Sequence, residues 1–132
     1  MHLLIAANDK RHAELGLFDP ADVRPAYRKV WACDRQLSQT LLINLKELLA
    51  AGGAGFKDLS GIGVFKGPAG FTDLRITHTV ANTLAYGLGL PVVNASGPDW
   101  RQICRRRLAI GENDGIVKPD YGRPPTVTTR KK

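Results

Sequence analysis

The first third of the chain contains three stretches of strand-forming residues separated by polar segments. Residues 3–7 (LLIAA) form a continuous apolar run, which is typical of a strand buried on both faces of a sheet. Residues 14–18 (ELGLF) follow the polar residues 8–12, so we expect a hairpin between these two strands. Residues 24–32 alternate loosely and predict a third strand, with Pro25 at its edge or start.

The pattern then changes to the period of an amphipathic helix. Leucines between positions 37 and 49 recur at helical spacing, and we expect Asp34 to open this helix and Gly52 to end it. The remaining expected elements are a strand, a helix, a strand and a helical piece, at residues 61–65, 72–86, 91–94 and 99–108.

This order, β-β-β-α-β-α-β, predicts an α/β fold. Three meandering strands followed by two crossover units build a five-stranded mixed sheet with helices packed on it, in a ribonuclease-H-like arrangement. We expect residues 1–95 to form this lobe, and residues 96–132 to form a basic C-terminal helix and a proline-rich tail. No apolar run approaches the ~20 residues of a membrane-spanning helix. The two cysteines form no CxxC pair, so we expect a cytoplasmic protein.

The net charge of +7 is concentrated near the C-terminus. Residues 1–100 hold 10 basic and 9 acidic side chains, whereas residues 101–132 hold 9 basic and 3 acidic ones. Such a segment is typical of contact with a polyanion such as nucleic acid, and equally typical of a tail that only solubilises. In the expected helix at residues 99–108, one side is apolar, and we expect that side to pack on the sheet. Its other side carries Arg101, Arg105 and Arg106, which we consider candidates for contact with RNA or an acidic partner.

Four segments resemble one known family. Residues 59–76 (LSGIGVFKGPAGFTDLRI) are similar to the signature GPGSFTGLRIG of the TsaB (YeaZ) proteins, and residues 85–93 (AYGLGLPVV) to their GLALGLGIPLVGV. Residues 37–42 (LSQTLL) resemble the family's HSExLLP, and residues 119–127 (PDYGRPPTV) its closing PxYLRPPxV. The segments follow the family's order, so the resemblance covers nearly the whole chain in pieces.

The resemblance implies a factor of tRNA threonylcarbamoyladenosine (t6A) synthesis with an actin-like fold, related to the sugar-kinase and heat-shock ATPases. It implies a non-catalytic protein without a cofactor that binds the catalytic subunit TsaD through helices of its N-terminal lobe. The ATPase TsaE joins that assembly, which acts on tRNA. Many members also form homodimers.

The chain departs from the family in two places. Relatives have two lobes, and the segment between Ser96 and Pro119 is too short for a second lobe. Relatives also carry Asp-Thr-Ser after the first strand, where this chain has Ala7, Asn8 and Asp9. An active ATPase of this fold uses the acidic residue there to hold metal and water near the phosphates. Ala7 lacks that carboxylate, and Asp9 is displaced by about two residues.

Two predicted helices carry more apolar positions than one packed face needs. Every one of these positions could pack on the sheet. The resemblance instead favours a partner-binding surface on the same two helices, and our candidates for it are Leu41, Leu45, Thr79, Thr83 and Tyr86.

The loop before the second helix is a candidate anion or nucleotide site. Gly67, Gly70 and Thr72 could present backbone N–H groups to a phosphate at a helix N-terminus. The loop lacks the Gly-Lys-Ser/Thr ending of a P-loop, and Asp73 would repel a phosphate. The alternative is a tight turn that requires glycine, with Thr72 as cap or first-turn residue.

Other chemistry finds little support in the sequence. His2, His12 and His78 lie in different elements without metal-ligand spacing, so we expect no metal site. Cys33 and Cys104 are expected to be small apolar residues rather than nucleophiles. Two rival functions stay open: a minimal actin-like ATPase or kinase lobe, and a stand-alone basic RNA-binding protein.

Overall fold

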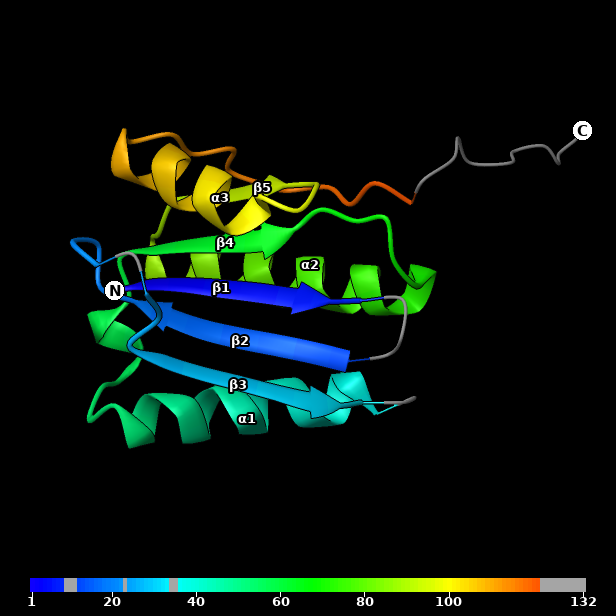
Figure 1. The fold of residues 1–132 in the computed structure, drawn as a ribbon, viewed down its shortest axis with the longest axis horizontal. Coiled ribbons are helices and arrows are strands. Elements are labelled where there is room, and N and C mark those ends of the chain that lie inside the picture. The colour runs from blue at the N-terminus through cyan, green and yellow to red at the C-terminus, as the bar shows by residue number, and fades with distance from the viewer. Residues whose placement is uncertain (9–11, 23, 34–35, 122–132) are drawn as a thin grey trace, which may run out of the picture.

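The computed structural model describes residues 1–8, 12–22, 24–33 and 36–121. In it, a five-stranded mixed sheet lies between two helical layers (Figure 1). The strands are β1 (His2–Ala7), β2 (His12–Phe18), β3 (Tyr27–Ala32), β4 (Gly61–Phe65) and β5 (Val92–Ala95). The helices are α1 (Leu37–Ala51), α2 (Phe71–Leu88) and α3 (Trp100–Ala109), with one 3-10 turn, η1 (Phe56–Asp58).

The strand order is β3-β2-β1-β4-β5. The first three strands are antiparallel neighbours, and β1, β4 and β5 are parallel. This confirms the predicted α/β fold with a five-stranded mixed sheet. Parallel strands need a crossover connection, and α1 and α2 supply it before β4 and β5.

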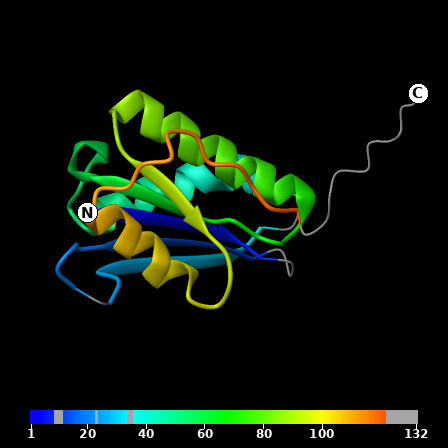
Figure 2. The ribbon, with the colours of Figure 1, turned by 90° about the horizontal axis from the view of Figure 1, so that it is seen from above.

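The two faces of the sheet are covered differently. Leu3 and Ile5 of β1 point into a large core beneath α1 and α2, whereas Leu4 points into a smaller core beneath α3. This alternation follows from the two-residue period of a strand. It explains why residues 3–7 are uniformly apolar, because β1 is central and both of its faces are covered (Figure 2).

Element boundaries differ slightly from the predicted ones. β3 begins at Tyr27 rather than at residue 24, because the chain bends at Arg24 and Ala26, on either side of Pro25. α2 continues to Leu88 and ends at Gly89, whose φ of 68° lies in the left-handed region that glycine favours. The residue before α1 is Gln36, and the predicted opener Asp34 lies outside the described residues.

α3 lies tight against the sheet because β4 offers glycine where the helix crosses it. A Cβ atom at Gly63 would lie 2.6 Å from a methyl of Leu4 and 2.7 Å from Cβ of Cys104. Trp100, Cys104 and Leu108 of α3 are buried in the core that they share with the sheet. The described residues of the second predicted segment, 96–121, therefore pack against those of the first.

The residues after α3 form an extended strap, residues 111–121, that returns along the edge of β5 beside α2 (Figure 2). The backbone N–H of Asp114 donates to the carbonyl of Val92 at 2.9 Å. The side chain of Asn94 donates to the carbonyl of Lys118 at 2.8 Å. The strap thus covers an edge that would otherwise present unpaired backbone groups to solvent. Within the described ranges, the helices include none that is both long and apolar enough to span a bilayer.

Candidate partner-binding surface

The outward face of α2 is nearly free of charge. Buried and exposed positions of α2 alternate with the helical repeat. The buried side, which packs against the sheet, includes Leu74, His78, Ala81 and Ala85. The exposed positions lie on the opposite side and are Phe71, Thr72, Arg75, Thr79, Thr83, Tyr86, Gly87 and Leu88. Among all 18 residues of α2, each of them described, Arg75 is the only exposed charged residue.

The predicted candidates on α2 are thus all exposed. Thr79, Thr83 and Tyr86 recur at intervals of four and three residues and form one outward stripe. Tyr86 is 92% exposed, although a tyrosine ring is a large apolar surface.

The two candidates on α1 are not exposed, and the expectation that they lie on the surface is wrong. Leu41 and Leu45 are 1% and 0% exposed, within the core beneath α1. They continue the stripe of Leu37 at four-residue spacing, which places them toward β2 and β3. The apolar residues of α1 that face outward are Leu42 and Ile43, 44% and 57% exposed. In the sequence, both residues lie outside the four-residue spacing of Leu37, Leu41 and Leu45, and this offset from the spacing is the signal that indicates an outward position.

A groove of about 300 Å³ runs between α1 and α2. Ile76 and Val80, both half-buried, contribute its apolar lining. Ser38, Thr72, Thr79 and Arg75 complete its walls. We call this groove, together with Leu42, Thr83 and Tyr86, the α1/α2 surface. The α1/α2 surface exposes hydroxyl and methyl groups and includes no carboxylate, a composition that suits contact with another protein.

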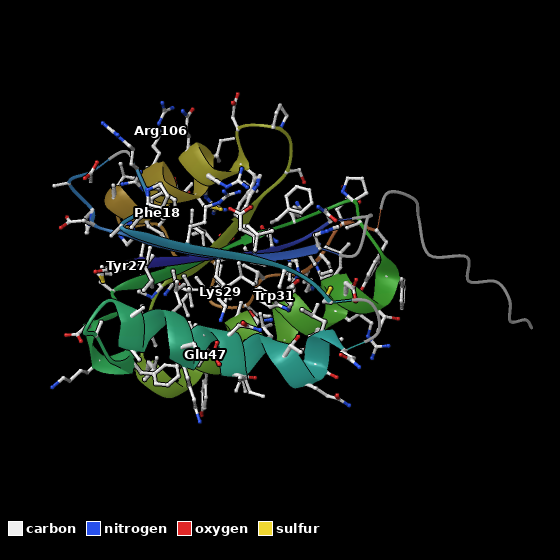
Figure 3. All side chains as sticks on the ribbon, turned by 60° about the horizontal axis from the view of Figure 1, so that its bottom comes forward. Phe18, Tyr27, Lys29, Trp31, Glu47 and Arg106 are labelled. Carbon is white, nitrogen blue, oxygen red and sulfur yellow. The ribbon has the colours of Figure 1, made fainter. Side chains whose placement is uncertain are left out.

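The edge strand β3 is attached to α1 by side chains. Tyr27, Lys29 and Trp31 point toward α1 (Figure 3). The indole N–H of Trp31 donates to Oγ1 of Thr40 at 3.0 Å, and Lys29 forms an ion pair with Glu47. These contacts fix α1 relative to the sheet, so the α1/α2 surface rests on a firmly positioned helix.

The loop before α2 that contains Gly67 and Gly70, which we call the glycine loop, packs against the strap. Gly67 has a φ of 109°, and a Cβ atom there would collide with the carbonyl oxygen of Asp120 and with Leu74. The backbone N–H of Asp120 donates to the carbonyl of Lys66 at 2.8 Å. This geometry fits the tight turn that requires glycine.

The start of α2 is acidic. A Cβ atom at Gly70 would lie 3.7 Å from a carboxylate oxygen of Asp73, which is buried in the first turn. That carboxylate already complements the positive end of the helix dipole and disfavours a second anion there. Thr72 is exposed, and no side chain caps the helix at Gly70.

The described residues at the carboxyl end of β1, Ala7 and Asn8, carry no carboxylate. Ala7 is buried, and the side chain of Asn8 accepts the backbone N–H of His12 at 3.0 Å, within the β1–β2 hairpin. Asp9 lies outside the described residues. Asn8 therefore serves the turn of the hairpin.

Two buried histidines and one buried cysteine have shifted pKa values. Burial lowers the pKa of His78, and Lys66 lowers it further, despite a hydrogen bond to the carbonyl of Leu74 that raises it. Burial, the N-terminal ammonium and Arg105 lower the pKa of His2. Burial raises the pKa of Cys104 to about 12, so this thiol stays protonated. Among the described residues, no three His, Cys, Asp or Glu side chains gather in a group able to hold a metal ion.

The arginines of α3 serve mainly to attach that helix. Arg101 donates to both carboxylate oxygens of Glu14, at 2.9 and 2.6 Å. Arg105 lies over the ring of Phe18, 4.6 Å from its centroid, and donates to the carbonyl of Asp19 at 3.1 Å. Of the three RNA-contact candidates, Arg106 remains exposed (Figure 3).

Glu14 is the carboxylate between α3 and the sheet. Burial alone would raise its pKa, but hydrogen bonds from Arg101 and Arg28 outweigh burial and hold the pKa below its usual value.

A second cluster of charged side chains, which the sequence analysis missed, lies at the other end of α3. Arg107 binds Glu112 at 2.5 Å and Asp114 at 2.5 and 3.1 Å, which raises the pKa of Arg107.

Comparison with known proteins matches the segment that carries the α1/α2 surface. The family model described as "TsaD: tRNA N6-adenosine threonylcarbamoyltransferase" matches residues 32–97, which include α1, β4, α2 and β5. "tRNA threonylcarbamoyladenosine biosynthesis protein TsaB" of Buchnera aphidicola is 31% identical over 64 residues, 48% of this chain and 29% of that protein. TsaB of Escherichia coli is also 31% identical over 64 residues, 48% of this chain and 28% of that protein.

Solved structures agree in fold. YeaZ from Pseudomonas aeruginosa superposes with a TM-score of 0.62 and 27% sequence identity over 73% of this chain and 44% of that one. RuvC of T. thermophilus, solved with a Holliday junction, has a TM-score of 0.50 and 14% identity over 91% of this chain and 83% of that one, which shows the fold alone. The matched segment spans less than a third of the length of the curated relatives. With the family match over residues 32–97, the chain belongs to the family described by the TsaD model, and it is similar to TsaB and YeaZ proteins.

Proposed function

We propose that this chain is a non-catalytic partner subunit in the t6A modification of tRNA, and that it binds a TsaD-type catalytic subunit through the α1/α2 surface. The observation that carries the proposal is the outward face of α2, where Arg75 is the only exposed charge in a chain with 23% charged residues. The cores of protein interfaces are depleted in charge and enriched in tyrosine, as this face is with Tyr86. The printed names of the relatives supply the pathway.

A non-catalytic role is supported by the ends of the central strands. Ala7 stands where a catalytic carboxylate would act, and Asn8 is engaged in the hairpin. The glycine loop packs against the strap at Asp120.

The remaining parts of the proposal follow the family. A TsaE-type ATPase joins the complex, tRNA is reached through the complex, and the setting is the cytoplasm. A homodimer would use the same α1/α2 surface and would compete with the catalytic subunit. Residues 1–95 supply the lobe that carries the α1/α2 surface.

The test is co-expression with the TsaD-type protein of the same genome, followed by size-exclusion chromatography. We expect one complex that contains both chains. The variant Tyr86→Glu should weaken binding at least about tenfold, because a carboxylate would be desolvated at the interface. Ile103→Glu is the matched control, since Ile103 is exposed on α3, on the opposite face of the sheet.

Three results would overturn the proposal or a part of it. If the wild-type proteins elute separately, this chain is not a partner of that subunit. If the purified chain alone turns over ATP, it is not a non-catalytic subunit. Equal loss of binding in Tyr86→Glu and Ile103→Glu would move the interface away from α2.

A further inference from the structure

A second groove lies beside the α1/α2 surface, between the C-terminal half of α2 and the strap. Its volume is about 730 Å³. Thr83 and Tyr86 form one wall, and Asn113 and Ile116 of the strap form the other. Ile116 is 69% exposed at the rim, opposite the 92% exposed Tyr86. No side chain that lines this α2/strap groove carries a charge.

Hydrogen bonds hold the strap wall in place. The side-chain amide of Asn82 donates to the carbonyl of Val117 at 3.0 Å and accepts its N–H at 2.8 Å. The Val117 side chain is buried in the core beneath α2. On the other side of Ile116, Oδ1 of Asn113 accepts the N–H of Gly115 at 2.8 Å and that of Val92 at 3.1 Å. Ile116 is therefore presented between two anchored residues rather than on a loose loop.

We propose that the α2/strap groove receives an apolar side chain of the same protein partner that docks on the α1/α2 surface, so that the strap forms a second wall of that interface. This inference rests on the proposed function. The two grooves adjoin along the outward stripe of α2, because Thr79 lines the first and Thr83, one helical turn further on, lines the second. A protein that lies along α2 as far as Tyr86 also covers the mouth of the groove.

The chemistry of the groove selects this occupant. A polyanion requires basic side chains, and the lining holds none, although the chain as a whole carries a net charge of +7. An apolar side chain gains from burial between Tyr86 and Ile116, and a preformed pocket costs little ordering on binding. The strap lies outside residues 32–97, the part of the chain that the family model matches.

The test measures binding of the full-length chain to the purified catalytic subunit by calorimetry. Ile116→Glu should weaken the complex at least about tenfold, and Ile116→Ala by a smaller factor, because a charge in an apolar interface costs more than a lost contact. Ile103→Glu, on the other face, should bind like the wild type. Thermal unfolding checks that each variant keeps the wild-type melting temperature.

The outcomes separate the two proposals. If the wild type does not bind, the proposed function fails and this inference with it. If Tyr86→Glu loses binding while Ile116→Glu binds like the wild type, only the inference fails. If Ile116→Glu instead abolishes self-association of the chain alone, seen by sedimentation, and leaves the complex intact, a second copy occupies the groove and the inference is overturned.

Discussion

The helices on the two faces of the sheet differ in the number of charged residues they carry and in how those charges are paired. On one face of the sheet, α2 presents an outward stripe of threonines with Tyr86 and one exposed charge, Arg75. On the other face, α3 has four arginines among its ten residues, and Glu14 and Asp114 lie opposite two of them. The first surface carries a single exposed charge, whereas the charges of the second are largely balanced by its own ion pairs.

This difference shows why a cluster of basic residues is weak evidence for a nucleic-acid site. An arginine that binds a carboxylate of its own chain attaches a helix and contributes little net field. The outward stripe of α2 offers the better surface for a protein, because covering it desolvates few charges.

The largest loss of stability should come from placing a charge on the buried side of α1 rather than on its exposed side. Leu41→Asp should destabilise the protein by about 4 kcal/mol or more, because it places a carboxylate in the core and removes a buried leucine. Ile43→Asp, on the exposed side, should cost less than about 1 kcal/mol. Urea unfolding compares the two variants. Equal losses would contradict the assignment of the faces.

A smaller loss is expected where α3 meets the sheet. Gly63→Val should destabilise the fold by about 2–3 kcal/mol, because its side chain would press α3 away from β4 at Leu4 and Cys104. Gly87→Val serves as a control, since a Cβ atom at Gly87 meets no heavy atom within 4 Å. Thermal unfolding should show a clear drop for Gly63→Val and little change for Gly87→Val.

The ion pair between α3 and β2 should contribute a pH-dependent part of stability. The pKa of Glu14 is lowered in the folded state, so its stabilisation is present above the usual glutamate pKa and is lost as pH falls through the lowered value. Glu14→Gln should cost about 1–2 kcal/mol at pH 7 and should lessen the loss of stability on acidification. Urea unfolding at a series of pH values measures both. A parallel pH dependence in wild type and variant would contradict the role of this pair.

The smallest effect should come from Arg106, the exposed arginine of α3. Arg106→Ala should change stability by less than about 0.5 kcal/mol. It should also leave binding to the catalytic subunit unchanged, because α3 lies on the sheet face opposite the α1/α2 surface. Unfolding curves and calorimetry measure the two quantities. A loss of binding would extend the interface to the α3 face.

Much of the fold could be predicted because its signals are local. The apolar run at residues 3–7, the leucine period of α1 and the strand at residues 61–65 each form the element that the pattern indicates. The candidate surface was predicted only in part. Thr79, Thr83 and Tyr86 are exposed, but Leu41 and Leu45 are buried, because both sides of α1 carry apolar residues and composition alone does not say which side packs.

The strap shows a different limit of sequence reasoning. Residues 111–121 contain no helical or strand period, and the sequence indicated only an irregular tail. Its path depends on contacts with distant residues: Val117 with Asn82, Lys118 with Asn94, and Asp120 with Lys66. Irregular backbone has no local signature, so only these long-range hydrogen bonds place Ile116 beside Tyr86.

The order of strands and helices, the glycine loop and the family resemblance could be predicted, because each depends on residues close together in the chain. Which apolar side of α1 packs on the sheet, where the strap runs and which charges are compensated depend on contacts between distant segments. Glu14 and Arg101 are separated by 87 positions in sequence yet lie within hydrogen-bond distance. Such pairs form when the sheet brings distant segments together, and no periodicity along the chain records them.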